Sequence, residues 1–157
     1  MISRIDAEQR AVELGCHAGL VGVLGQDAAL AAARQVALKV TTFAGAEIDR
    51  WASEMETLST EGYAAEIRDL FGADIRRDLA AAAVQTVGQV ESIRLSEFDG
   101  STGVAFAVVQ QTYSSRGQPQ SVSDILRMEI AVERVGGEWL VSDVAVLGPT
   151  TLVPDEN

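Results

Sequence analysis

The sequence predicts an α+β fold in which N-terminal helices pack on a four-stranded antiparallel sheet. Apolar residues recur at helical spacing in the alanine-rich first half, whereas they alternate with polar residues along the second half. Asp99-Gly100 and Gly136-Gly137 mark tight turns between the strand-length segments. Helices followed by an antiparallel meander indicate α+β rather than α/β, because each layer needs the other to bury its apolar side.

Three helices are expected in the first half. The first is capped by Asp27, the second begins at Asp49, and the third begins at Thr60. The third is expected to end by Gly88 and to allow a kink at Gly72, because glycine costs about 1 kcal/mol inside a helix. It carries one apolar stripe, made of Tyr63, Ile67, Leu70, Phe71, Ile75 and Leu79.

Four strands are expected in the second half, at residues 89–98, 103–113, 121–135 and 138–146, with a polar loop at 114–120. The third strand alternates most clearly. One face of this strand carries Val122, Asp124, Leu126, Met128, Ile130 and Val132, and the other carries Arg127, Glu129 and Glu133. Such alternation is typical of a sheet with one covered face.

The length of 157 residues indicates one domain. We expect an N-terminal helical or juxtamembrane segment at 1–25, the α+β domain at 26–148 and a flexible tail at 149–157. The apolar stretch at 14–24 is shorter than the ~20 residues that a membrane-spanning helix needs. The residues before it have mixed charge and lack the basic region of a signal peptide.

Charge and composition exclude several function classes. The chain has 23 acidic and 12 basic residues, a net charge of −11, so no nucleic-acid partner is expected. Cys16 and His17 are the single cysteine and the single histidine, too few for an internal disulfide or a structural zinc site. As neighbours in a helix they also project in different directions, which disfavours a Cys–His dyad. We therefore expect no metal and no cofactor.

Asp124 is the best catalytic candidate, although a weak one. It shares the apolar face of the third strand, where burial would raise the pKa of a carboxyl group and suit it to act as a general base. Tyr63 and Tyr113 are weak candidates for hydrogen-bond donors to an oxyanion. The competing interpretation, which we favour, places Asp124 in partly solvated surroundings near the loop and treats both tyrosines as packing residues.

Other conspicuous residues have a structural and a functional interpretation. Asp143 alternates with Trp139 and Val141, so it is either a pocket acid or an outward-facing strand residue. Trp51 and Trp139 are expected to be core residues that join the helices to the sheet. The pair at 76–77, Arg-Arg, is expected to lie on a solvated helix face, with a partner contact as the alternative.

Two stretches resemble known families. The ending VERVGGEWLVSDVAVL, at 132–147, is similar to the last hairpin of nuclear-transport-factor-2-like cone domains. The stretch at 27–71 resembles the Mce-associated membrane proteins of high-GC bacteria. It has their Ala-Ala-Arg helix (31–34), their Val-Thr-Thr exit (40–42), an acidic segment (47–49) and a Gly-aromatic pair (62–63). The single lysine among eleven arginines also fits a high-GC genome.

The resemblance implies a curved antiparallel sheet, cystatin-like or nuclear-transport-factor-2-like, and a non-enzymatic role. Mce-associated proteins are thought to stabilise or assemble lipid-importing Mce complexes of the cell envelope, so protein partners of such a complex are expected. The alternatives are a scaffold component of a type IV secretion or conjugation machine, a small cone-fold isomerase or hydrolase, and a lipid-binding module. A lipid in the cone and a homo-oligomer are left open.

The N-terminus departs from the Mce-associated pattern. Members of that family carry a transmembrane helix before the alanine-rich helix, where this chain has only LGCHAGLVGVL. The resemblance implies an extracytoplasmic domain at the cell membrane whose anchor is absent from this chain. The alternative is a cytoplasmic protein.

Overall fold

The computed structural model describes residues 17–149, and the side chains of residues 25–147 within them. The elements are α2 (His17–Thr41), β1 (Phe43–Ala44), the 3₁₀ turn η1 (Gly45–Glu47), α3 (Ile48–Thr57), α4 (Glu61–Leu70), α5 (Ala73–Ala81), β2 (Gln85–Phe98), β3 (Thr102–Ser115), β4 (Gln118–Val135) and β5 (Glu138–Pro149).

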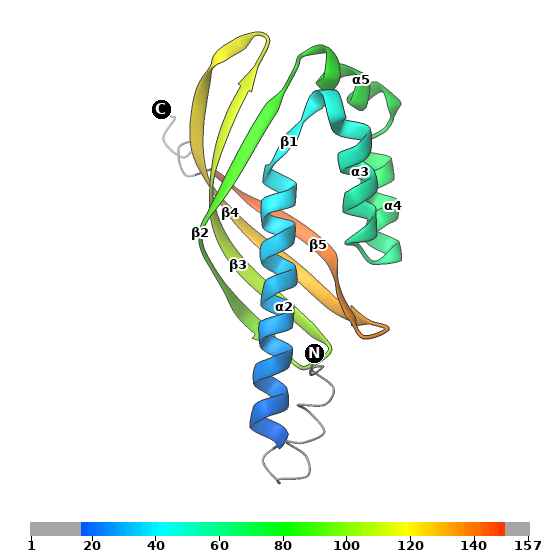
Figure 1. Ribbon diagram of the computed structural model, residues 1–157, viewed down its shortest axis with the longest axis vertical. Helices are drawn as coiled ribbons and strands as arrows, with labels where there is room; N and C mark the ends of the chain where they lie inside the picture. The colour runs from blue at the N-terminus through cyan, green and yellow to red at the C-terminus, as the bar shows by residue number, and fades with distance from the viewer. Residues whose placement is uncertain (1–16, 150–157) are drawn as a thin grey trace, which may run out of the picture.

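The fold is α+β, with helices packed against a curled antiparallel sheet that forms a half-barrel. The sheet is a meander in the order β1-β2-β3-β4-β5. It therefore has five strands rather than the expected four, because two residues of β1 pair with the start of β2. Figure 1 shows α2 running along the sheet, with α3, α4 and α5 grouped to one side of it. The predicted fold class is confirmed.

The first helix begins earlier than the sequence predicts. It extends without interruption from His17 to Thr41, so Asp27 lies inside α2 and is not its cap. Gly25 lies inside this helix at a tight position, where a Cβ would lie 3.1 Å from the ring of Phe98. Small side chains let α2 lie close to the sheet, and Ala29, Ala33 and Ala37 are fully buried on that side.

The expected third helix is two helices. Thr60 is confirmed as the cap of α4, because its hydroxyl accepts a hydrogen bond from the backbone N–H of Tyr63. The backbone at Gly72 is extended and caps α5, so Gly72 separates two helices rather than allowing a kink. The predicted apolar stripe is wrong at Leu70 and Ile75, since the break turns both side chains to solvent. The helical region also ends before Gly88, because β2 starts at Gln85.

The strands agree with the predicted order but are longer. The expected polar loop at 114–120 is a tight turn, in which only residues 116–117 separate β3 from β4. Both glycine turns are confirmed, with positive φ angles of 98° at Gly100, 58° at Gly136 and 87° at Gly137. In the first turn, the Asp99 carboxylate accepts hydrogen bonds from two backbone N–H groups, which lowers its pKa to about 2.

Side chains from both layers fill the centre of the cone. Met55 of α3 meets the buried face of the sheet. The sheet residues with 0–1% exposure are Ala105, Ala107, Val109, Met128, Ile130, Val132 and Val141. The covered face predicted for the third strand is confirmed at Met128, Ile130 and Val132, but Val122 is exposed near the β3–β4 hairpin. Trp51 is buried as expected, whereas Trp139 is only half-buried against Phe98.

Candidate functional site

Asp124 and Tyr113 lie on the same face of neighbouring strands. Asp124 of β4 pairs with Gln111 of β3, and Val122 of β4 pairs with Tyr113 of β3. The two pairs are two residues apart along each strand, so their side chains point to the same side of the sheet, and the second pair is nearer the hairpin. Asp124 is half-buried, and Tyr113 is exposed. These two residues can therefore face a common ligand, but on an open part of the sheet near the hairpin.

Tyr63 lies in a different part of the fold. It is buried in α4 beside β5, and burial raises the pKa of its hydroxyl, with further contributions from the negative charges of Asp143 and Glu66. Asp143 pairs with Ala131, which is seven residues from Asp124 along β4, about 23 Å at 3.3 Å per residue. The fold keeps Tyr63 away from Asp124, so of the two candidate tyrosines only Tyr113 shares a face with Asp124.

Asp143 does not share the face of Trp139 and Val141. Ala131 of β4 pairs with Asp143 of β5, and the next residue of β4, Val132, pairs with Val141. The register shifts between these two pairs, so Ser142 is an extra residue in β5. The bulge reverses the alternation beyond it and leaves Asp143 exposed. The interpretation of Asp143 as an outward-facing residue is correct. Cys16 and the side chain of His17 lie outside the described part of the structure.

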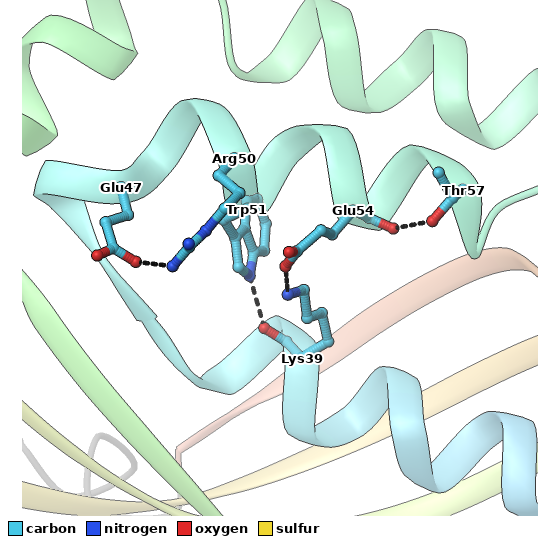
Figure 2. A network of polar contacts seen from close by, with 6 residues as sticks. All are labelled: Lys39, Glu47, Arg50, Trp51, Glu54 and Thr57. Carbon is cyan, nitrogen blue, oxygen red and sulfur yellow. Dashed lines mark hydrogen bonds and ion pairs between the residues drawn. The ribbon is translucent and has the colours of Figure 1, made fainter.

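A polar groove lies between the end of α2, β1, α3 and the start of β2. It has a volume of about 350 Å³. Figure 2 shows its polar residues: Lys39 forms an ion pair with Glu54, and Arg50 forms one with Glu47. The hydrogen bond from Lys39 lowers the pKa of the Glu54 carboxyl. The Arg50 and Glu47 side chains are largely in solvent, so their ion pair contributes little to stability, whereas the Lys39 side chain is only 26% exposed.

Trp51 connects this groove to the core. Its indole N–H donates a hydrogen bond of 2.7 Å to the backbone carbonyl of Lys39 (Figure 2). Its ring lies 5.4 Å from that of Phe43 and 5.0 Å from that of Phe71, measured between centroids. The indole thus satisfies a carbonyl in the last turn of α2 and holds α3 against it.

The chemistry of this groove suits binding and structural support. Both of its cations are paired with carboxylates, so neither is positioned as a lone electrophile. Across the described residues, no group of three or more histidine, cysteine, aspartate or glutamate side chains is placed to hold a metal ion. The sequence interpretation missed the groove, since Lys39, Trp51 and Glu54 converge only after α2 and α3 pack together. The one feature of the sequence that could have indicated this groove is Lys39, the single lysine of the chain.

Several solved structures with a similar fold are type IV secretion proteins. An IcmL-like type IV secretion system protein from Legionella pneumophila matches with a TM-score of 0.62 at 12% identity, covering 76% of this chain and 89% of that one. The VirB8 protein of Agrobacterium tumefaciens matches with a TM-score of 0.62 at 7% identity, covering 80% and 93%. A TrwG component of the type IV secretion system of Bartonella birtlesii matches with 0.54 at 17%, covering 74% and 86%.

Because these sequence identities are low, the structural similarity establishes only the fold. This fold is the nuclear-transport-factor-2-like cone that the last hairpin of the sequence led us to expect. No family model and no curated protein matches the sequence. Within the described residues, no helix has the length and hydropathy needed to cross a membrane.

Proposed function

We propose that this domain is a non-enzymatic scaffold in a type IV secretion or conjugation machine of the cell envelope. The likeness to the Legionella and Bartonella secretion components, over about three quarters of the chain, supports this role. It favours the secretion alternative over the Mce-type lipid transport suggested by the sequence motifs. The domain would lie outside the cytoplasm, attached to the membrane or to a membrane-bound partner.

The filled cone is the observation that carries the proposal. A lipid-binding module needs a deep apolar cavity, and a cone-fold enzyme needs polar groups that converge on one point. Here Met55, Met128 and Ile130 occupy the centre with no exposed surface. Tyr63 lies far from Asp124, and Tyr113, which shares a face with Asp124, is exposed on an open part of the sheet, which argues against an enclosed catalytic pocket. A scaffold requires neither feature, because it binds partners on its surface.

The full-length gene product is expected to fractionate with the membrane and to cross-link to envelope proteins. Amine-reactive cross-linkers are poorly suited, because the chain has a single lysine, Lys39, whose side chain is only 26% exposed. A photo-reactive amino acid placed at exposed Leu70 or Leu147 avoids this problem. Irradiated cells should yield adducts with secretion-machine components, identified by mass spectrometry, and unirradiated cells should not. Recovery of all the protein free in the cytoplasm, without a membrane-bound partner, would refute the envelope role.

A further inference from the structure

One long edge of the sheet has no strand beside it. β1 pairs only with Gln85 and Thr86 of β2, so residues 87–98 of β2 have β3 on one side and no strand on the other. Figure 1 shows this part of β2 at the rim of the sheet, on the side away from β5. We call residues 87–98 the β2 edge. Neighbouring residues of a strand turn their backbone N–H and C=O groups to opposite sides, so part of these groups point away from β3.

The strand pairing identifies which backbone groups are free. The N–H of Gly88 donates to Thr42 Oγ1 at 3.0 Å, so Gly88 faces away from β3, and its partner Gln111 faces β4. β3 pairs with β4 without a register shift from Thr102 to Tyr113, so every second residue back from Gln111 also faces β4. The β2 partners of those residues face outward, and they are Val90, Ile93, Leu95 and Phe98. No hydrogen bond from a described residue outside the sheet reaches their backbone groups.

The helix α2 borders the β2 edge on the covered side of the sheet. The two elements meet at both ends, because a Cβ on Gly25 would lie 3.1 Å from the Phe98 ring and Thr42 bonds to Gly88. Between them, at the start of the edge, is a hollow of about 450 Å³. It is lined by Gln35, Leu38, Lys39, Thr42, Val87 and Gly88. Leu38 is 38% exposed, so an apolar side chain of a bound strand can pack on it.

The carboxylates beside the β2 edge are unpaired. Glu91 and Glu97 are exposed, and neither belongs to an ion pair with a described side chain. The one cation of the edge, Arg94, lies with its guanidinium over the Phe106 ring, 5.8 Å from the centroid. The whole chain carries a net charge of −11. The charge of the β2 edge therefore favours a basic occupant.

We propose that the β2 edge binds an extended, basic segment of a protein partner by strand addition. The free N–H and C=O groups identify an extended backbone as the occupant, because an added strand pairs with them. Successive side chains of that segment point to opposite faces, so apolar residues would face Leu38 on the covered side. Basic residues would then face Glu97, which pairs with Val104 on the other face of the sheet.

A second copy of the chain is a poorer occupant of the β2 edge. It would bring the same two glutamates and another net charge of −11 to the contact. Charged residues on an edge strand commonly prevent pairing between identical edges, and they leave a segment of opposite charge as the suitable partner. The biological meaning of this inference rests on the proposed scaffold function, but the binding itself can be measured on the isolated chain.

Amide hydrogen exchange, measured by NMR on the 157-residue chain, tests the inference. The probe is an acetylated eight-residue peptide in which lysine alternates with valine. Register shifts flank residues 92–95, so pairing should be most regular there. Millimolar peptide should slow exchange at Ile93 and Leu95 about tenfold or more, whereas Ser92 and Arg94 already face β3 and should change little. The amides of residues 143–147 in β5, the other edge of the sheet, should not change.

Two comparisons separate backbone pairing from charge attraction. The same peptide with every backbone nitrogen methylated keeps its charges but loses its N–H donors, so it should not protect Ile93. Glu91→Lys/Glu97→Lys should reduce the affinity for the lysine–valine peptide at least tenfold. Glu129→Lys/Glu133→Lys makes the same charge change at exposed positions of β4 and should bind more tightly than the first double variant. Circular dichroism verifies that both variants are folded.

Leu38→Lys gives an independent check, because it puts a cation in the hollow without changing the glutamates, and it should also weaken binding. The inference is overturned if the methylated peptide binds as tightly as its parent, if a peptide with glutamate in place of lysine binds more tightly, or if both double variants lose affinity equally. It is also overturned if a second copy of the chain occupies the edge, or if the peptide protects no amide there. Failure of peptide binding with envelope cross-links intact would refute this inference alone and leave the scaffold role standing.

Discussion

Trp51→Ala is expected to lower the free energy of unfolding by about 3–5 kcal/mol, the usual cost of truncating a buried tryptophan. The Trp51 side chain is buried between Phe43 and Phe71, with 6% of the residue exposed. Truncation would leave a cavity in this aromatic cluster and remove the hydrogen bond to the Lys39 carbonyl. A domain of this size has a total stability of about 5–15 kcal/mol, so the loss is a large fraction of it. Urea unfolding followed by fluorescence or circular dichroism measures the change.

Two controls separate the contributions to the Trp51 effect. Trp51→Phe keeps an aromatic ring but removes the indole donor, so it should cost less than alanine. Trp139→Ala truncates the same side chain at a half-buried position and should also cost less, which corrects the expectation from the sequence that both tryptophans are core residues. Equal losses for the two alanine variants would contradict the burial described here.

Gly88→Ala is expected to destabilise the protein by about 3 kcal/mol, the upper end of the range for inserting one methyl group into a packed site. A Cβ at Gly88 would lie 1.8 Å from Thr41 Oγ1 and 2.6 Å from Thr41 Cβ. Thr41 has little freedom to move, because it is 1% exposed and its hydroxyl donates a 2.7 Å hydrogen bond to the Ala37 carbonyl. The added methyl group would push the end of α2 away from β2.

Gly62→Ala is the matched control for Gly88→Ala. Gly62 lies in α4 with no neighbour within 4 Å of the added Cβ, so alanine there should stabilise the helix by about 0.5–1 kcal/mol. Thr41→Ala in the Gly88→Ala background removes the clashing hydroxyl oxygen but keeps the Thr41 Cβ position, so it should recover only part of the lost stability. A double-mutant cycle measures this coupling. A Gly88→Ala protein as stable as the parent would show that α2 and β2 are not in such close contact.

The parts of the fold that depend on local chemistry could be predicted from the sequence. Asp99-Gly100 and Gly136-Gly137 require positive φ angles at their glycines, which identifies the turns directly. Alternation along the third strand identified its covered face because the side-chain period of a strand is two. Thr60 was recognisable as a cap because a threonine hydroxyl can satisfy a free N–H at the start of a helix.

The sequence-based predictions were wrong where contacts between distant parts of the chain decide the structure instead of the local preference for helix or strand. β1 has two residues, too few for any periodicity, and it exists because Phe43 and Ala44 pair with residues more than 40 positions later. The bulge at Ser142 moved Asp143 to solvent, and a regular alternation cannot anticipate one extra residue. α2 continues through Gly25, where a Cβ would lie 3.1 Å from the Phe98 ring, and no local signal near residue 25 reveals this close approach.

The polar contacts between helices were less predictable than the fold. Their residues come from helices that meet only after folding: Trp51 reaches back to Lys39, and Arg76 reaches back to Asp49. The Arg-Arg pair at 76–77 was noticed, but the sequence could not show that Arg68 would lie beside it. Conversely, Asp124 was suggested by its place on the apolar face of the third strand and Tyr63 by its residue type, and the topology of the sheet separates them.

The central claim is that this domain acts by binding partners rather than by chemistry. Complementation of a strain lacking the gene by the Asp124→Asn variant tests it most directly, with the readout being the phenotype of the deletion, such as the frequency of DNA transfer. The substitution keeps the size of the side chain and should change stability by at most about 1–3 kcal/mol. The scaffold account predicts that the folded variant, present at the level of the parent protein, restores the parental phenotype. A folded Asp124→Asn protein at that level that fails to restore it would contradict the account and favour a catalytic role for Asp124.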